Sequence, residues 1–168
     1  IAYARLTQDD NKTLSTRNLC WVSQTGKSWS SFNEFGQNGW WLWRLTWHNK
    51  LAYGFAYNRR ANAIHLYQGD PRRTFSLLQP SALSLIKHNK GYPNESDLVF
   101  VKDMAYAIVR RDADSYSAQL GVSAPPYTQW KWHDLKAYIG GPAMLYIKGN
   151  MALVSGRIVQ GKKLVTGL

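Results

Sequence analysis

The sequence predicts an all-β protein of the β-propeller class, and two observations support this prediction. The first is composition: the 168 residues are 45% hydrophobic and 14% aromatic, with eight Trp and ten Tyr. Aromatic residues favour pleated, half-buried strands, and a helical surface rich in Ala, Glu and Lys is missing. The second is an internal repeat with a period near 50 residues, which is typical of propeller blades.

An apolar residue followed by alanine marks each repeat. The four marked segments are IAYARL (1–6), LAYGFAYNRR (51–60), MAYAIVRRD (104–112) and MALVSGR (151–157). Each is predicted to be a strand that ends at or near an arginine, and the alanines are 50, 53 and 47 residues apart. A second mark, an aromatic residue at Trp29, Phe75 and Trp130, recurs in register at intervals of 46 and 55 residues. Two marks that share one period indicate a true repeat.

Short alternating segments lie between the marks. WLWRLTW, AIHLYQ, SDLVFV and AMLYIK are typical of strands, and HNK, VKD, KGN and QGKK are typical of hairpin turns. About four strands fit each period, as in a blade. We therefore expect one partial propeller over residues 1–168, with about three complete blades, parts of two others, and blade repeats near residues 1, 51, 104 and 151. A propeller closes into a ring, so further blades or a second chain are expected to complete it.

Charge and cysteine content narrow the function classes. The formal net charge is +11, which permits attraction to nucleic acid, anionic lipid or acidic sugar. No block of five or six basic residues occurs, so nucleic acid is not the expected partner. Cys20 is the single cysteine, and it shares no metal-type spacing with the histidines, so neither a metal nor a cofactor is expected. No apolar run approaches the length of about 20 residues that a membrane span needs, and the start lacks a signal-peptide pattern.

The segment that ends at Trp29 resembles the Asp-box of sialidases. The matching positions are Gly26, Ser28 and Trp29. Gln24 occupies the acidic position, and the copies ending at Phe75 and Trp130 are more degenerate. Because the Asp-box is a turn on an outer hairpin, it implies a fold and not a site. Nearly the whole chain resembles bacterial exo-alpha-sialidase-like proteins, most strongly over 92–157, and the resemblance implies a six-bladed propeller.

The same resemblance implies a site. Sialidases place a glutamate ahead of one inner strand and an arginine at the end of the next strand, and Glu95 with Arg110 or Arg111 is similar in order and spacing. Arg157, at the end of KGNMALVSGR, is similar to the arginine of the following blade. The implied roles are an activating, catalytic base for Glu95 and substrate binding for Arg110, Arg111 and Arg157.

Physical arguments refine these roles. Strand alternation turns only one of Arg110 and Arg111 toward the site. Arg44, within WWLWRLTWH, is a further substrate-binding candidate, because an arginine among tryptophans either stacks on them or faces the channel. The alternative is that Glu95 only forms a salt bridge with a nearby arginine at the start of a strand. An exposed salt bridge of this kind contributes little to stability. Most of the tryptophans are expected in the core.

The resemblance implies an exo-sialidase-like glycoside hydrolase that acts on a terminal acidic sugar. Planar guanidinium groups suit the carboxylate of such a sugar, and sialidases use a tyrosine nucleophile. That tyrosine, and the acid/base aspartate, are expected outside these residues, so the chain alone is expected to be inactive. The alternative is a non-catalytic carbohydrate-binding or scaffold propeller with a basic surface. The family also implies an extracellular or periplasmic location.

Overall fold

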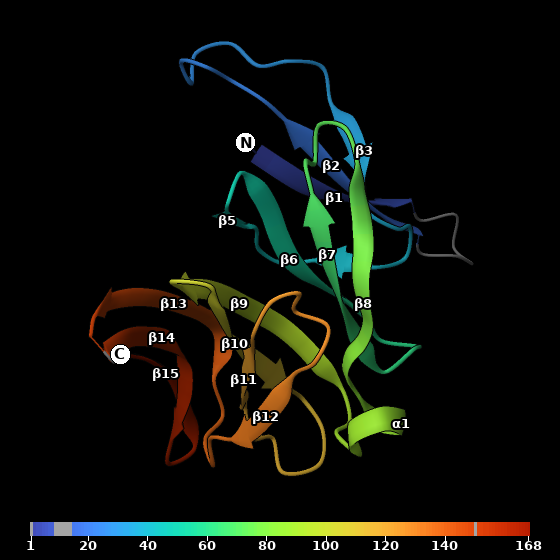
Figure 1. Cartoon of the computed structure of the whole chain (residues 1–168). Coiled ribbons are helices and arrows are strands. Elements are labelled where there is room, and N and C mark those ends of the chain that lie inside the picture. The colour runs from blue at the N-terminus through green and yellow to red at the C-terminus, as the bar shows by residue number, and fades with distance from the viewer. Residues whose placement is uncertain (1, 9–14, 150) are drawn as a thin grey trace.

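The computed structural model describes residues 2–8, 15–149 and 151–168, and its architecture is all-β (Figure 1). Within these residues the strands form four antiparallel sheets, none of them closed on itself. Each sheet consists of strands that are consecutive in the sequence. The all-β prediction is therefore confirmed, whereas the propeller type stays a prediction.

The four sheets follow one another along the chain. Sheet 1 contains β1 (Ala2–Gln8), β2 (Ser15–Trp21) and β3 (Asn33–Phe35). Sheet 2 contains β4 (Trp41–Leu42), β5 (Thr46–His48), β6 (Leu51–Asn58), β7 (Ala63–Gly69) and β8 (Phe75–Ser84), followed by the short helix α1 (Leu85–His88). Sheet 3 contains β9 (Pro93–Val101), β10 (Met104–Arg111), β11 (Gln119–Ser123) and β12 (Lys131–Asp134). Sheet 4 contains β13 (Gly140–Lys148), β14 (Met151–Gln160) and β15 (Lys163–Gly167).

The repeated alanine segments occupy one strand in each sheet, namely β1, β6, β10 and β14. In sheets 2, 3 and 4 that strand pairs with the strand before it and the strand after it. The aromatic marks lie at or just before the start of the last strand of sheets 2 and 3, at Phe75 and Trp130. Trp29 lies in the corresponding β2–β3 connection. The repeat in the sequence thus corresponds to a repeat of strand order.

The predicted hairpin turns join neighbouring strands. In the HNK turn between β5 and β6, Asn49 and Lys50 both have positive φ, 47° and 66°. Two positive φ values in a two-residue connection match the right-handed twist of a hairpin. Gly149 and Gly161 take positive φ in the β13–β14 and β14–β15 turns, a conformation that glycine adopts without a Cβ penalty.

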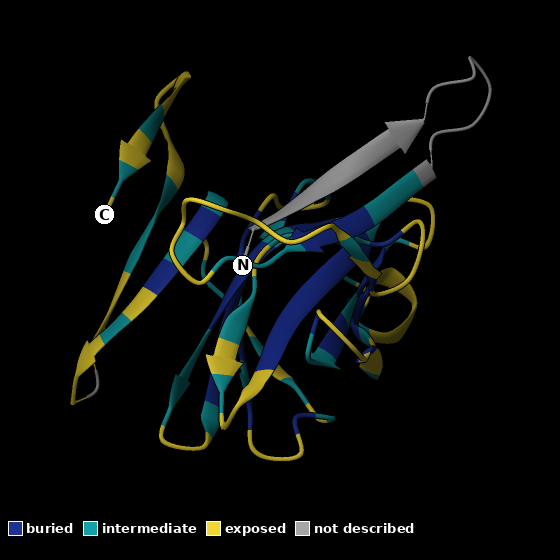
Figure 2. Cartoon of the chain, turned by 90° about the horizontal axis from the view of Figure 1, so that it is seen from above, coloured by how far each residue is buried: buried dark blue, intermediate teal, exposed yellow. Residues whose placement is uncertain are grey.

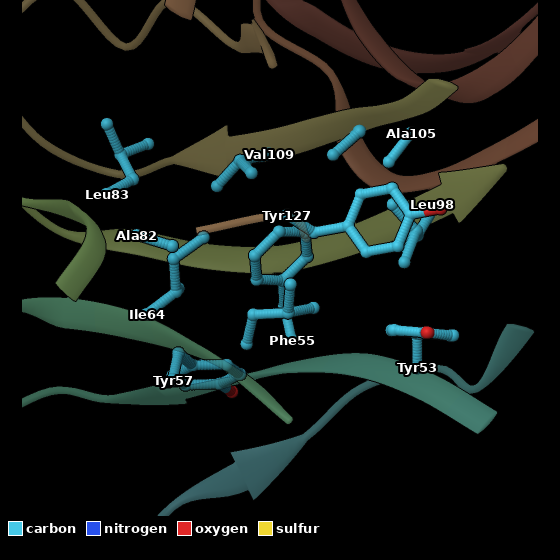
Figure 3. Close-up of a cluster of buried hydrophobic side chains, with 12 residues drawn as sticks. Tyr53, Phe55, Tyr57, Ile64, Ala82, Leu83, Leu98, Ala105, Val109 and Tyr127 are labelled. Atoms are coloured by element: carbon cyan, nitrogen blue, oxygen red, sulfur yellow. The ribbon is translucent and has the colours of Figure 1, made fainter. Parts of the chain in front are cut away.

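The main core lies between sheets 2 and 3 (Figure 3). Phe55 and Tyr57 of β6 face Leu98 of β9 and Val109 of β10, and all four are buried. Phe55 contacts the ring of Trp130 edge-on, with centroids 5.2 Å apart. Aromatic side chains bury the largest apolar area per residue, so this layer supplies much of the hydrophobic stabilisation.

Two of the repeated alanines, Ala52 and Ala105, are buried as predicted. Among the described residues Trp40 is the one buried tryptophan, so the prediction that most tryptophans lie in the core is wrong, although Trp41, Trp130 and Trp132 pack against the core.

A second core joins sheets 1 and 2. Cys20 of β2, Trp40, and Ala56 of β6 belong to this buried cluster. The buried amide of Asn18 connects the two sheets as well, because its Nδ2 donates to the Trp40 carbonyl at 2.8 Å and its Oδ1 accepts from the Leu42 N–H at 3.1 Å. Because both the donor and the acceptor of this buried amide are hydrogen-bonded, the contact favours a single position of sheet 1 relative to sheet 2.

Sheet 4 and the β2–β3 connection depart from the expected burial. Leu145, Leu153 and Leu164 are more than 40% exposed on sheet 4, and Ala152 is exposed although its equivalents Ala52 and Ala105 are buried. Figure 2 shows the ribbon near the C-terminus in yellow and teal rather than dark blue. Trp29 is 49% exposed. Among the described residues no further sheet covers these positions, which explains their exposure.

Replacing Phe55 with alanine tests the core between sheets 2 and 3. We expect a loss of about 3–5 kcal/mol in the free energy of unfolding, because the ring is 2% exposed and its removal leaves a cavity between two sheets. Urea denaturation measures the loss. The control is Ile86→Ala on α1, where the side chain is 97% exposed and the change should stay within about 0.5 kcal/mol. Equal effects of the two substitutions would contradict this packing.

Candidate functional site

Arginines gather where equivalent strands of sheets 2, 3 and 4 end. β6 is followed directly by Arg59 and Arg60, β10 contains Arg110 near its end, and β14 contains Arg157. Arg59, Arg60 and Arg110 line one hollow of about 540 Å³, together with the carboxylates of Glu95 and Asp112. The repeat therefore produces a cluster of guanidinium groups from three sheets.

Glu95 is the centre of this cluster. Its Oε2 atom accepts hydrogen bonds from Arg110 Nη1 at 2.6 Å, from the Gly141 N–H at 2.7 Å and from Arg157 Nη2 at 3.3 Å. The donors come from β10, β13 and β14. The glutamate and both arginines were predicted to share a site, and the structure brings the three side chains together. Their catalytic and substrate-binding roles stay predictions.

A β-bulge positions Glu95. Val109 pairs with Ser96 and Arg111 pairs with Pro93, so two residues of β9, Asn94 and Glu95, lie opposite the single Arg110 of β10. A bulge re-aims side chains and increases the local twist. Here it brings the Glu95 carboxylate onto the Arg110 guanidinium across the hairpin.

Arg110 is held on two sides. Its Nε donates to Asp112 Oδ1 at 2.7 Å, and Asn94 Nδ2 donates to Asp112 Oδ2 at 2.6 Å. Burial opposes the charged guanidinium, but the hydrogen bonds to Glu95 and Asp112 outweigh burial and raise the pKa of Arg110. Arg110 is therefore a fixed positive charge with a defined orientation, as a bidentate anion-binding arginine requires.

Arg157 is the more accessible arginine of the pair. Its side chain is 49% exposed, against 18% for Arg110. Glycines border it: a Cβ added at Gly140 would lie 3.3 Å from Arg157 Nε, and Gly141 has a φ of 56°. Larger residues at these positions would crowd the guanidinium or strain the backbone. The arrangement leaves Arg157 open to an anionic ligand while its Nη2 stays on Glu95.

Two aromatic rings stack on the arginines of the cluster. The Arg59 guanidinium lies over the Tyr92 ring at 4.8 Å, and the Arg110 guanidinium lies over the Tyr138 ring at 5.6 Å. Such cation–π contacts restrain the guanidinium planes. Burial raises the pKa of Tyr138, although Arg110 opposes the shift. This phenol is consequently neutral at physiological pH, and it is not activated as a nucleophile.

Arg111 lies outside the cluster. Its side chain is completely buried, and it donates to the carbonyls of Gly91 and Ser117 at 3.2 Å each and forms an ion pair with Asp114. Alternation along β10 had predicted that only one of the two neighbouring arginines faces the site. The geometry gives Arg111 a structural position, because a side chain with no exposed surface cannot reach a ligand.

Arg44 lines a different hollow, of about 1090 Å³, beside β9 and β13. Trp41 borders both hollows. The carboxylate nearest to Arg44 in this hollow is Asp97, whose Oδ2 lies 4.0 Å from Arg44 Nη1. Asp97 Oδ2 also accepts the Met144 N–H at 2.7 Å. Arg44 is thus next to the Glu95 cluster but does not belong to it.

The sequence did not identify Asp97, Asp112, Asn94 or Gly141 as part of these sites. Asp112 directly follows the arginine pair in the segment RRD, so the sequence could have indicated that its carboxylate lies near Arg110. The position of Asn94 could not be predicted without the β-bulge. The positions of Gly141 and Asp97 could not be predicted without the packing of β13 on β9.

Comparison with known proteins adds no identification: no protein-family model matches the sequence, and no curated protein matches it. The sialidase resemblance therefore stays a prediction. In the described part of the chain, no three His, Cys, Asp or Glu side chains are grouped so that they could hold a metal ion. No helix there is long and apolar enough to cross a membrane.

Replacing Arg111 with leucine tests its structural position. We expect a loss of about 3–5 kcal/mol in the free energy of unfolding, because the buried ion pair is broken and two buried carbonyls lose their donors. Chemical denaturation measures the effect. Arg73→Leu, at an exposed arginine of the β7–β8 turn, is the control and should change stability by less than about 0.5 kcal/mol. A stable Arg111→Leu variant would contradict the assignment.

The pH dependence of stability tests Asp97. Burial raises the pKa of Asp97, with the Met144 and Leu98 N–H groups and Arg44 opposing the shift. A raised folded-state pKa means that the folded protein binds the proton more tightly. The contribution of Asp97 to stability is therefore largest below the unfolded pKa of about 3.9 and is lost as the pH rises through the folded value. Asp97→Asn keeps an acceptor for Met144 and should remove this fall.

Urea denaturation at a series of pH values measures the difference between wild type and Asp97→Asn. The control is Asp103→Asn, because the Asp103 side chain is 73% exposed. If wild type and Asp97→Asn keep parallel stability curves above about pH 4, Asp97 does not titrate as described.

Proposed function

We propose that this chain is part of a β-propeller of the sialidase type, in which each of the four sheets is a blade. Three features support the proposal. Each sheet is built from consecutive antiparallel strands, and the repeated alanine segment occupies an equivalent strand in sheets 2, 3 and 4. Buried side chains pack sheet 1 against sheet 2 and sheet 2 against sheet 3. The ring would be completed by further blades or by a second chain.

We propose that the Glu95 cluster recognises the carboxylate of an acidic sugar. The observation that supports this most is the Arg110–Glu95–Arg157 arrangement, in which one carboxylate orients two guanidinium groups from different sheets. Arg157 is half-exposed, so a ligand carboxylate can bind its remaining N–H groups without displacing Glu95. Arg59 and Arg60 add positive charge to the neighbouring hollow.

Each residue has a distinct role in this proposal. Arg157 forms paired hydrogen bonds with the carboxylate of the ligand. Glu95 and Asp112 hold Arg110 in place, so that its charge faces the same ligand with little loss of side-chain entropy. The Gly141 N–H and the Arg157 contact fix the Glu95 carboxylate itself. The ligand is expected to be a terminal sialoside-type sugar.

Hydrolysis by an exo-sialidase-like mechanism is the activity we propose for the assembled protein, with Glu95 as the activating base. The nucleophile and the acid that this reaction needs are expected from outside these residues, so the chain alone should bind without turnover. The alternative, a non-catalytic carbohydrate-binding or scaffold propeller, is favoured by the two ion pairs that already engage Arg110. An extracellular or periplasmic location is proposed from the same resemblance.

Titration with sialic acid tests the recognition of a carboxylate. Isothermal calorimetry should detect binding of sialic acid, and its methyl ester, which lacks the negative charge, should bind at least about tenfold more weakly, a difference of about 1.4 kcal/mol. Arg157→Ala should weaken the binding of sialic acid to a similar extent. Arg73→Ala, which changes an exposed arginine outside the cluster, should have no effect.

Equal affinity for sialic acid and its methyl ester would overturn carboxylate recognition. Turnover of a fluorogenic sialoside, measured on the same preparation, separates binding from catalysis. Loss of turnover in Glu95→Gln with unchanged binding of sialic acid would support the proposed hydrolase. Binding without turnover is the result expected for this chain alone, because the nucleophile and the acid are expected from outside these residues.

A further inference from the structure

A second, apolar hollow lies between sheets 3 and 4. It has a volume of about 470 Å³, and its walls include Val99 and Ile108 of sheet 3 and Met144 and Val154 of sheet 4. No residue of the Glu95 cluster lines it. Its size lies within the range of about 300–1,000 Å³ that is typical of small-molecule sites.

The contrast with the neighbouring layer makes this hollow unusual. Between sheets 2 and 3 the space is filled by Tyr53, Phe55 and Tyr57 of β6 and by Tyr127 (Figure 3). Between sheets 3 and 4 the positions equivalent to Tyr53 and Phe55 are Tyr106 and Ile108 of β10, and they line the hollow together with Ala152 and Val154 of β14. Met151 and Ala152 of its lining are exposed, so the hollow opens to solvent along β14. Its mainly apolar lining favours an apolar occupant over water.

The hollow is elongated along the strands. Val101 lines it at the β9–β10 turn, and Leu120 lines it at the start of β11. Their partners on β10, Met104 and Ile108, are four residues apart, about 13 Å at the usual rise of about 3.3 Å per residue. A hollow that extends this far along the strands can accommodate a linear chain.

Positive charge lies at one end of the hollow. Lys102 directly follows the lining residue Val101, and Lys148 directly precedes the lining residue Gly149, and both lysines are exposed. Asp103 is the acidic residue beside them, and it lies 3.4 Å from His48. Two exposed lysines next to lining residues of an apolar space favour a molecule with one anionic end.

We propose that the hollow between sheets 3 and 4 binds a linear aliphatic carboxylate, such as a fatty acid, with its chain between the sheets and its head group near Lys102 and Lys148. The side chains of Ile108, Met144 and Val154 contact the chain. This site is separate from the Glu95 cluster and does not depend on the function proposed for that cluster.

Binding of cis-parinaric acid, a fluorescent fatty acid, tests the proposal on the 168-residue chain. Saturable binding is expected for the wild type. Val154→Phe, which fills the hollow, should weaken binding at least tenfold. Leu153→Phe is the matched control, because Leu153 is the neighbouring residue on the opposite, exposed face of β14. It should leave the affinity within twofold.

The other outcomes contradict the proposal. No saturable binding to the folded wild type, or unchanged binding in Val154→Phe, means that the hollow does not accept the probe. An equal loss in Leu153→Phe means that the probe binds the exposed face of sheet 4. If Val154→Phe does not fold, as judged by circular dichroism, Ala152→Leu replaces it, since Ala152 also lines the hollow.

Competition experiments test the head group separately. Dodecanoate should displace the probe, and the Lys102→Ala, Lys148→Ala double variant should weaken dodecanoate several-fold while dodecanol is unaffected. Lys131→Ala, at an exposed lysine on β12, is the control. If dodecanol and dodecanoate lose affinity equally, the lysines do not bind the carboxylate, and the head-group assignment is wrong.

Discussion

Two carboxylates of β9 determine how sheet 4 is placed on sheet 3. Glu95 accepts the Gly141 N–H and Asp97 accepts the Met144 N–H, each at 2.7 Å, and both donors belong to β13. Charged acceptors form stronger hydrogen bonds than neutral ones, and an unpaired buried carboxylate is costly, so these contacts favour a single register between the sheets. The same register brings Arg157 of β14 within hydrogen-bond distance of Glu95 and so completes the Arg110–Glu95–Arg157 cluster.

The layer between sheets 3 and 4 is packed differently from the layer between sheets 2 and 3. Aromatic side chains fill the latter, and their packing alone can fix the distance between the sheets. In the former, Tyr106 and Ile108 of β10 and Ala152 and Val154 of β14 leave a hollow, and hydrogen bonds from β13 to the β9 carboxylates link the sheets. The two proposed sites thus lie along one interface, with guanidinium groups at its end and an apolar space within it.

Much of the fold was predictable because the repeat is local. An Ala-led strand such as β6 or β10 and its flanking turns show in the sequence through alternation and turn residues, and these place the strands correctly. The proximity of Glu95, Arg110 and Arg157 was predictable from the family resemblance alone. Asp97 and the Asn94–Glu95 bulge were not, because they depend on the register between strands and sheets. Alternation along β10 indicated that only one of Arg110 and Arg111 faces the site. It did not show which one, and this followed only from the burial of Arg111 in the structure.

Amide hydrogen exchange at Gly141 and Met144 tests most directly whether the β9 carboxylates hold sheet 4. Both amides should exchange slowly in the wild type, and Glu95→Ala should accelerate Gly141 far more than Met144, while Asp97→Ala should do the reverse. This pattern would show that each carboxylate protects its own partner. If both amides exchange in the wild type as fast as those of an unfolded chain, β13 is not bound to β9, and the cluster around Glu95 does not form.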